Sequence, residues 1–270
     1  MRNNKGTFRF MLMVVLMLAL VAFPTSASAN HSWGKYHWAR TSNPFTLKVG
    51  DNVNSTWDTY LNGAISDWNP STVLDLSKVT GSTSGSTCAP TSGRIEVCNA
   101  AYGTTGWLGI AQIWTTRGSH IVQATTKVND TYFNQAQYNT AAWRRLVMCQ
   151  EIAHDFGLAH QDENFNNVNL GTCMDYTNDP DGGGAYGPSN EHPNAHDFEQ
   201  LVTIYSHIDR VTTVGTSAPA DAPPGFMNAD MHAQENWGEK VSESASGRSA
   251  IYVQDFGNGF KIITHVFWAQ

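Results

Sequence analysis

The residues most able to do chemistry are two histidines six positions apart, His154 and His160, with Glu151 three positions before the first. On a helix, positions 150 and 154 lie one turn apart and point the same way. Glu151 lies next to that face, where its carboxylate could reach a water held on a metal. Gly157, midway between the histidines, can adopt the left-handed conformation that ends a helix, so that His160 returns to the same point. The spacing predicts a metal site with its own base, although a glutamine, Gln150, occupies the first ligand position of the pattern.

A hydrolytic zinc site has well-defined requirements. It needs three protein ligands, an open position for water, and a base beside that water. His154 and His160 suit the ligand role, and Glu151 suits the role of the base. The run Glu151-x-x-His154-x-x-Gly157-x-x-His160 resembles the metzincin metallopeptidase signature, H-E-x-x-H-x-x-G-x-x-H with a methionine turn downstream.

The second part of that signature is also present, because the segment 171–176 is similar to the methionine turn. The resemblance implies that Met174 lies beneath the metal. It also implies that Tyr176 approaches the metal and assists the transition state, as in the astacin and serralysin branches. The fold implied is a metzincin-like catalytic domain of the α+β class, and the final helix resembles the matrixin arrangement.

Gln150 departs from the family pattern at the place of the first zinc ligand. A glutamine offers only a neutral amide oxygen, which binds zinc more weakly than an imidazole nitrogen does. Three interpretations follow: Gln150 coordinates weakly, another group completes the ligand set, or metal and activity have been lost. The groups nearby in sequence that could complete the set are His192, His196, Asp162 and Glu163.

The four cysteines, Cys88, Cys98, Cys149 and Cys173, form an even set that allows three pairings. Cys88 and Cys98 flank a short loop and are expected to pair, which leaves Cys149 for Cys173. The alternatives are free buried thiols and zinc ligation, although no Cys-x-x-Cys pair is present. In the metzincin fold the segments of the second pair stack together, so that a bridge would fix the helix to the methionine turn beneath the metal.

The N-terminus resembles a secretion signal. Three basic residues precede an apolar run at 10–23 and small residues that end at Ala29. This run has 14 residues, fewer than the roughly 20 that a membrane-spanning helix needs. We therefore expect cleavage after Ala29 and a secreted, extracellular protein without a stable membrane anchor. Paired cysteines are typical of that oxidising setting.

The formal net charge of −7 argues against nucleic acid or an anionic membrane as a partner. We expect a monomer that acts on a peptide or protein substrate. The Asn- and Asp-rich segment 178–184 has oxygen ligands that calcium prefers, although these residues also favour an exposed turn. The run 107–114 could hold an extended peptide as an edge strand, or could be ordinary core.

Hydrophobic periodicity predicts a strand, a helix, three or four strands, a helix, a long loop and a last helix. The strands are expected at 45–49, 73–76, 94–98, 106–114 and 121–128, and the helices at 55–68, 141–156 and 195–208. This order predicts an α+β fold, a twisted mixed sheet packed on helices, with Thr140 capping the helix that carries the histidines.

The composition divides the chain into a signal peptide (1–29), a metzincin-like peptidase domain (30–210), a linker (211–226) and a C-terminal β-hairpin segment (227–270). The leading hypothesis is a secreted zinc-dependent metalloendopeptidase that hydrolyses peptide bonds by metal-activated water. The alternative is a secreted non-catalytic binding or structural protein on the same fold. A third hypothesis is a fold without metal, in which the histidines only pack.

Overall fold

The computed structural model describes residues 30–270, so the predicted signal peptide (1–29) lies outside the described part. His31–Gln270 forms one compact unit built on a nine-stranded sheet. In sheet order the strands are β3 (Leu74–Thr80), β2 (Phe45–Asn52), β4 (Ile95–Ala100), β6 (His120–Asn129), β5 (Trp107–Thr116), β9 (Phe260–Trp268), β8 (Ser249–Gly257) and β7 (Glu239–Glu243), and β1 (His37–Trp38) pairs with β6. Within residues 30–270, no helix has the length and apolar character needed to cross a membrane.

The sheet is mixed, as the sequence predicted. Strands β2, β3, β4 and β6 pair in parallel, whereas β5, β7, β8 and β9 join the sheet through antiparallel pairs. The helices are α2 (Asp58–Trp68), α3 (Asp130–Phe133), α4 (Ala141–His154), α5 (Ala195–Ile204) and the 3₁₀ turn η1 (Gln234–Asn236).

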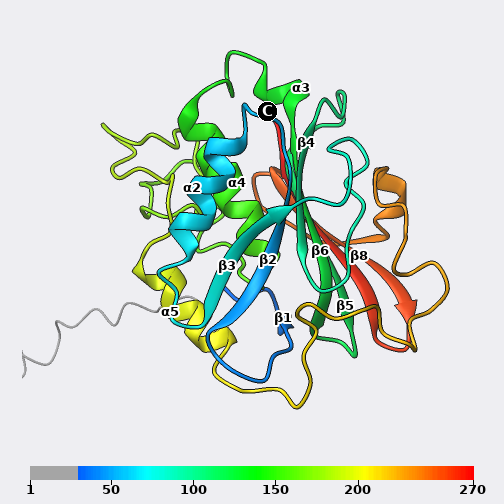
Figure 1. Ribbon diagram of the computed structural model, residues 1–270. Helices are drawn as coiled ribbons and strands as arrows, with labels where there is room; N and C mark the ends of the chain where they lie inside the picture. Colours follow the sequence, from blue (N-terminus) through cyan, green and yellow to red (C-terminus); the bar gives the residue numbers. More distant parts are fainter. Residues whose placement is uncertain (1–29) are drawn as a thin grey trace, which may run out of the picture. The chain divides into compact units, whose positions relative to one another are not determined.

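Helix α4 is the element that carries the predicted site. Its N-terminus is capped by Thr140, whose hydroxyl accepts a hydrogen bond from the Trp143 amide at 3.2 Å, as predicted. The helix packs on β5 and β6, with α2 beside it on the same face of the sheet (Figure 1). Twelve of its fourteen residues are buried, so it lies in the interior between sheet and helices.

The C-terminal hairpin is present as β8 and β9, and it continues the main sheet because β9 pairs with β5. The segment before it covers the opposite face of the sheet: the Trp114 indole donates to the carbonyl of Phe226 at 2.9 Å, and Phe226 is fully buried. The boundaries at 210 and 226 therefore mark a change in composition and not a spatial separation.

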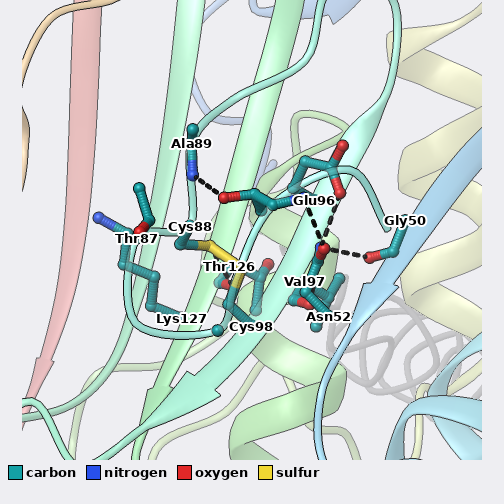
Figure 2. The surroundings of a disulfide bond; sticks show 12 residues. Gly50, Asn52, Thr87, Cys88, Ala89, Glu96, Val97, Cys98, Thr126 and Lys127 are labelled. Carbon is teal, nitrogen blue, oxygen red and sulfur yellow. Dashed lines mark hydrogen bonds between the residues drawn. A yellow bond between two sulfur atoms is a disulfide. The ribbon is translucent and has the colours of Figure 1, made fainter. Parts of the chain in front are cut away.

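Both predicted disulfides are present, Cys88–Cys98 and Cys149–Cys173, and no described cysteine is free. Figure 2 shows the first, which joins the loop before β4 to the strand itself. Beside it, the Asn52 amide donates to the Glu96 carboxylate at 2.7 Å. The second joins α4 to the methionine turn, so it holds together the two segments that flank the histidines.

Candidate metal centre

Three histidines from distant parts of the chain converge beside α4. His154 is the last residue of α4, His160 follows the turn at Gly157, and His265 lies in β9. One ring nitrogen of each lies within 4.8 Å of the corresponding atoms of the other two. Gly157 has a φ of +100°, and a Cβ there would lie 2.3 Å from the carbonyl oxygen of Tyr36. Glycine thus permits both the turn and the close packing that bring His160 back to His154.

His265 was not among the predicted site residues, although the alternation of its strand contains a signal. In β9, Ile263 and Phe267 face the core that includes α4, whereas Ile262 and Val266 face the opposite core. Side chains alternate along a strand, so position 265 shares the face of 263 and 267. A histidine at a position that should hold a core hydrophobic residue indicates a buried polar site.

The hydrogen bonds of the rings leave lone pairs facing each other. His154 Nδ1 donates to the carbonyl of Leu158 at 2.7 Å, and His160 Nδ1 donates to the carboxylate of Glu163 at 3.1 Å. Both acceptors lack a proton to give, so in each neutral ring Nε2 carries a lone pair. These two Nε2 atoms lie 3.1 Å apart. A cation between them would relieve the repulsion. In a tetrahedral zinc site with bonds near 2.0 Å, two ligand atoms lie about 3.3 Å apart.

Burial keeps the histidine cluster neutral. It lowers the pKa of His154 well below its ordinary value, and the rings of His265 and His160 lower it further. Burial likewise lowers the pKa of His160, against the opposing effect of Glu163, and that of His265 to about 3. Metal ligation requires unprotonated imidazole, so these shifts suit the residues to a metal.

Glu151 lies beside the cluster without a hydrogen-bond partner. Neither carboxylate oxygen is hydrogen-bonded within the described residues, and Oε2 is 3.6 Å from His265 Nδ1. Burial raises the pKa of Glu151 well above its ordinary value, against a lowering by His160. Gly109 of β5 makes room for this side chain, because a Cβ there would lie 2.8 Å from Glu151 Oε1.

The methionine turn lies against the same cluster. Met174 is fully buried and follows Cys173, which is bonded to Cys149 of α4. The ring centroids of Tyr176 and His160 lie 4.3 Å apart, and the Tyr176 hydroxyl is 3.3 Å from His265 Nε2. The structure thus brings Tyr176 to the histidines, where its hydroxyl can contact a ligand or a reacting group.

Gln150 lies one turn before His154, and its amide nitrogen donates to the Cys173 carbonyl at 2.8 Å. Its Oε1 is buried and has no hydrogen-bond partner within residues 30–270, so this oxygen is the atom available to a metal. The ligand role of Gln150 stays a prediction, and His265 now provides an imidazole for the third position.

The other predicted alternatives are engaged elsewhere or lie outside the group of ring nitrogens. His192 pairs with Asp67 at 2.7 Å, and His196 with Glu199 at 3.4 Å. Asp162 accepts a hydrogen bond from the Asn164 amide at 2.9 Å. Glu163 orients His160 as described above.

The candidate calcium loop uses one of its oxygens in another contact. Asn178 Oδ1 accepts a hydrogen bond from the guanidinium of Arg248 at 2.5 Å. A cation already beside that oxygen opposes a second one, which favours the turn interpretation for this part of 178–184.

Two segments enclose the centre. The ring centroid of Trp33 lies 5.6 Å from that of His154 and 6.1 Å from that of His265. On the other side, β5 is paired with both β6 and β9, so of the two interpretations of 107–114 the ordinary core is confirmed and the edge strand open to a peptide is wrong. The side chains of Glu151, His265 and His160 are only 0%, 2% and 4% exposed.

Comparison with known proteins gives matches to solved structures. No protein-family model matches the sequence, and no curated protein matches it significantly. The structure matches High choriolytic enzyme 1, a hatching enzyme zinc-protease from Oryzias latipes (medaka fish), with 12% identity and a TM-score of 0.36 over 68% of this chain and 98% of that chain. It also matches myroilysin, with 11% identity and a TM-score of 0.37 over 65% of this chain and 98% of that chain. The resemblance of this chain to the metzincin-type zinc metallopeptidases rests on the motif from Glu151 to His160 and on the methionine turn.

Proposed function

We propose that this chain is a secreted zinc-dependent metalloendopeptidase whose metal ligands are His154, His160 and His265. The observation that carries the proposal is the pair of facing Nε2 lone pairs of His154 and His160, 3.1 Å apart, with a third imidazole beside them. Such a donor set suits zinc, which prefers nitrogen ligands in a tetrahedral arrangement. The two disulfides support an oxidising, extracellular location.

A bound zinc ion would supply Lewis acidity and lower the pKa of water toward neutrality. Glu151 would then take the proton from the attacking water and deliver it to the departing amine. Its raised pKa suits that task, because a carboxylate with an ordinary pKa is a weak acid catalyst at neutral pH. Tyr176 would donate its hydroxyl hydrogen bond to the oxyanion that forms on the scissile carbonyl.

A second candidate function is favoured by the enclosure of the centre. Because β9 occupies the side of β5 where a peptide would pair, and Trp33 packs on the ligands, a substrate requires displacement of one of these segments. A non-catalytic binding or structural protein, in which the same metal stabilises the fold, needs no such movement.

Hydrolysis of casein by the purified protein separates the two functions. The peptidase proposal predicts cleavage that a chelator abolishes and added zinc restores, with Glu151→Ala inactive but still loaded with metal. Retained metal without any cleavage supports the structural role. Cleavage that survives the chelator and the Glu151→Ala substitution counts against both the metal and the proposed base.

A further inference from the structure

A second group of metal-ligating side chains lies away from α4. It brings together His37 of β1 with His207 and Asp209, which follow α5, and their ligand atoms all lie within 4.8 Å of one another. His120, at the start of β6, is adjacent because it pairs in register with His37. Three segments that are distant in sequence thus meet at one point.

The separations within this group match those of a metal site. His37 Nε2 lies 3.1 Å from His207 Nε2, and these two atoms lie 3.6 Å and 3.5 Å from Asp209 Oδ1. A tetrahedral ion with bonds near 2.0 Å places its ligand atoms about 3.3 Å apart. His120 Nε2 lies 3.4 Å from the same carboxylate oxygen, and its side chain is 25% exposed.

The surrounding hydrogen bonds orient two of these ligands. His37 Nδ1 donates to the carbonyl of Lys35 at 2.7 Å, which leaves the lone pair of the neutral ring on Nε2, toward the group. Arg40 holds the other oxygen of Asp209, with Nη1 2.9 Å from Oδ2, and so leaves Oδ1 directed at the histidines. Orientation of a ligand through its second polar atom is typical of metal sites.

The group is accessible to an ion from solvent. A surface pocket is lined by His37 and His207 together with Lys35 and Ser119. The side chain of His207 is 50% exposed, whereas that of His37 is 7% exposed. An ion can therefore enter on the His207 side and meet the better-buried ligands behind it.

We propose that His37, His207 and Asp209 bind a divalent transition-metal ion of the zinc class, with His120 as a fourth ligand, and that this ion fastens the N-terminal segment to the end of α5. Imidazole and carboxylate ligands together suit zinc. The fastened segment also contains Trp33, which packs on His154, so the ion would hold the cover of the first centre in place.

The test is the zinc content of the purified full chain after loading with zinc and dialysis. We expect two zinc ions per chain in the wild type and one in His207→Ala. We also expect the melting temperature of that variant to be lower than that of the wild type by at least about 5 °C, because bound metal stabilises the folded state. His192→Ala removes another exposed histidine, paired with Asp67, and should keep both ions. Asp209→Asn keeps the shape of the side chain and serves as a second variant that should also lose one ion.

Substitution of His265 separates this proposal from the proposed function. One ion in the wild type that is lost in His265→Ala and kept in His207→Ala overturns the second site and leaves the first. One ion that is lost in His207→Ala and kept in His265→Ala supports the second site and counts against the first. Two ions in the wild type that persist in both His207→Ala and Asp209→Asn also overturn the second site.

Discussion

The two histidine groups use a carboxylate in opposite ways. Beside His154, His160 and His265, Glu151 is buried and its oxygens have no hydrogen-bond partner within the described residues. In the group of His37 and His207, the carboxylate of Asp209 is held by Arg40. Burial alone would raise the pKa of Asp209, but the hydrogen bonds from the Arg40 backbone and side chain, with the charges of His37 and His120, outweigh burial and lower that pKa. Burial raises the pKa of Glu151.

This difference indicates which group can do chemistry. A carboxylate fixed by an arginine is a stable anion and therefore a suitable ligand, but it is a poor proton carrier near neutral pH. An unpaired buried carboxylate has a raised pKa and can both accept and return a proton. Under the proposed function, catalysis would therefore belong to the centre beside α4, and the proposed ion at the β1 group would have a structural role.

The largest expected effect is that of His265→Ala. Removal of the third imidazole should release the ion at the α4 centre and lower casein hydrolysis by more than about 100-fold. Metal analysis and initial rates measure the two effects, with His192→Ala as the matched control. Full metal content and activity in His265→Ala would return the third position to Gln150.

The substitution Glu151→Gln keeps the size of the side chain but removes its proton chemistry. Hydrolysis should fall by about 10²- to 10⁴-fold, which is the usual contribution of a general acid–base group. The metal content should not change, because Glu151 is not a ligand in this account. Unchanged rates would show that another group carries the proton.

A smaller effect is expected from Gly109→Ala on β5. The added Cβ would lie 2.6 Å from Val147 Cγ1 and 2.8 Å from Glu151 Cγ, so Glu151 must shift. We expect about a tenfold loss of activity and a destabilisation of about 1–3 kcal/mol, with both metal sites kept. Gly63→Ala on α2 is the control, since a Cβ there meets no atom within 4 Å. Wild-type rates in Gly109→Ala would show that the position of Glu151 is not critical.

The smallest effect concerns Asp175, a buried carboxylate outside both groups. Burial raises its pKa to about 6, against the hydrogen bonds from Leu170 and Asn190. Between pH 4 and 6 Asp175 therefore holds more proton in the folded state than in the unfolded state, so its contribution to stability should fall as pH rises through this window, by at most about 3 kcal/mol. Chemical denaturation across this range should show that the free energy of unfolding of the wild type falls relative to that of Asp175→Asn as pH rises, because all other titrating groups are common to the two proteins. An equal slope in the variant would assign the titration to another group.

Local signals in the sequence predicted much of the fold and two of the three histidines of the α4 centre. The cap at Thr140, the turn at Gly157 and the mixed sheet follow from residue types and periodicity, and both disulfides were predicted correctly. The alternation in β9 marks His265 as a buried polar residue, but its position beside α4 could not be predicted, because it reaches α4 only through the pairing of β9 with β5.

The same limit applies to the second group. His37 lies in a two-residue strand, and His207 and Asp209 follow the end of α5, so no motif spacing joins them. Their approach depends on the packing of the N-terminal segment against the sheet. His37, His207 and Asp209 are brought together only by long-range contacts, so this group has no local spacing from which it could be predicted.

The central claim is that His265 supplies the third ligand of the α4 centre, and anomalous diffraction at the zinc absorption edge tests it most directly. In crystals of the zinc-loaded protein, we predict an anomalous peak within bonding distance, about 2.0–2.1 Å, of one ring nitrogen each of His154, His160 and His265. A peak bound by His154, His160 and Gln150 with His265 turned away, or no peak between these histidines, would contradict the account.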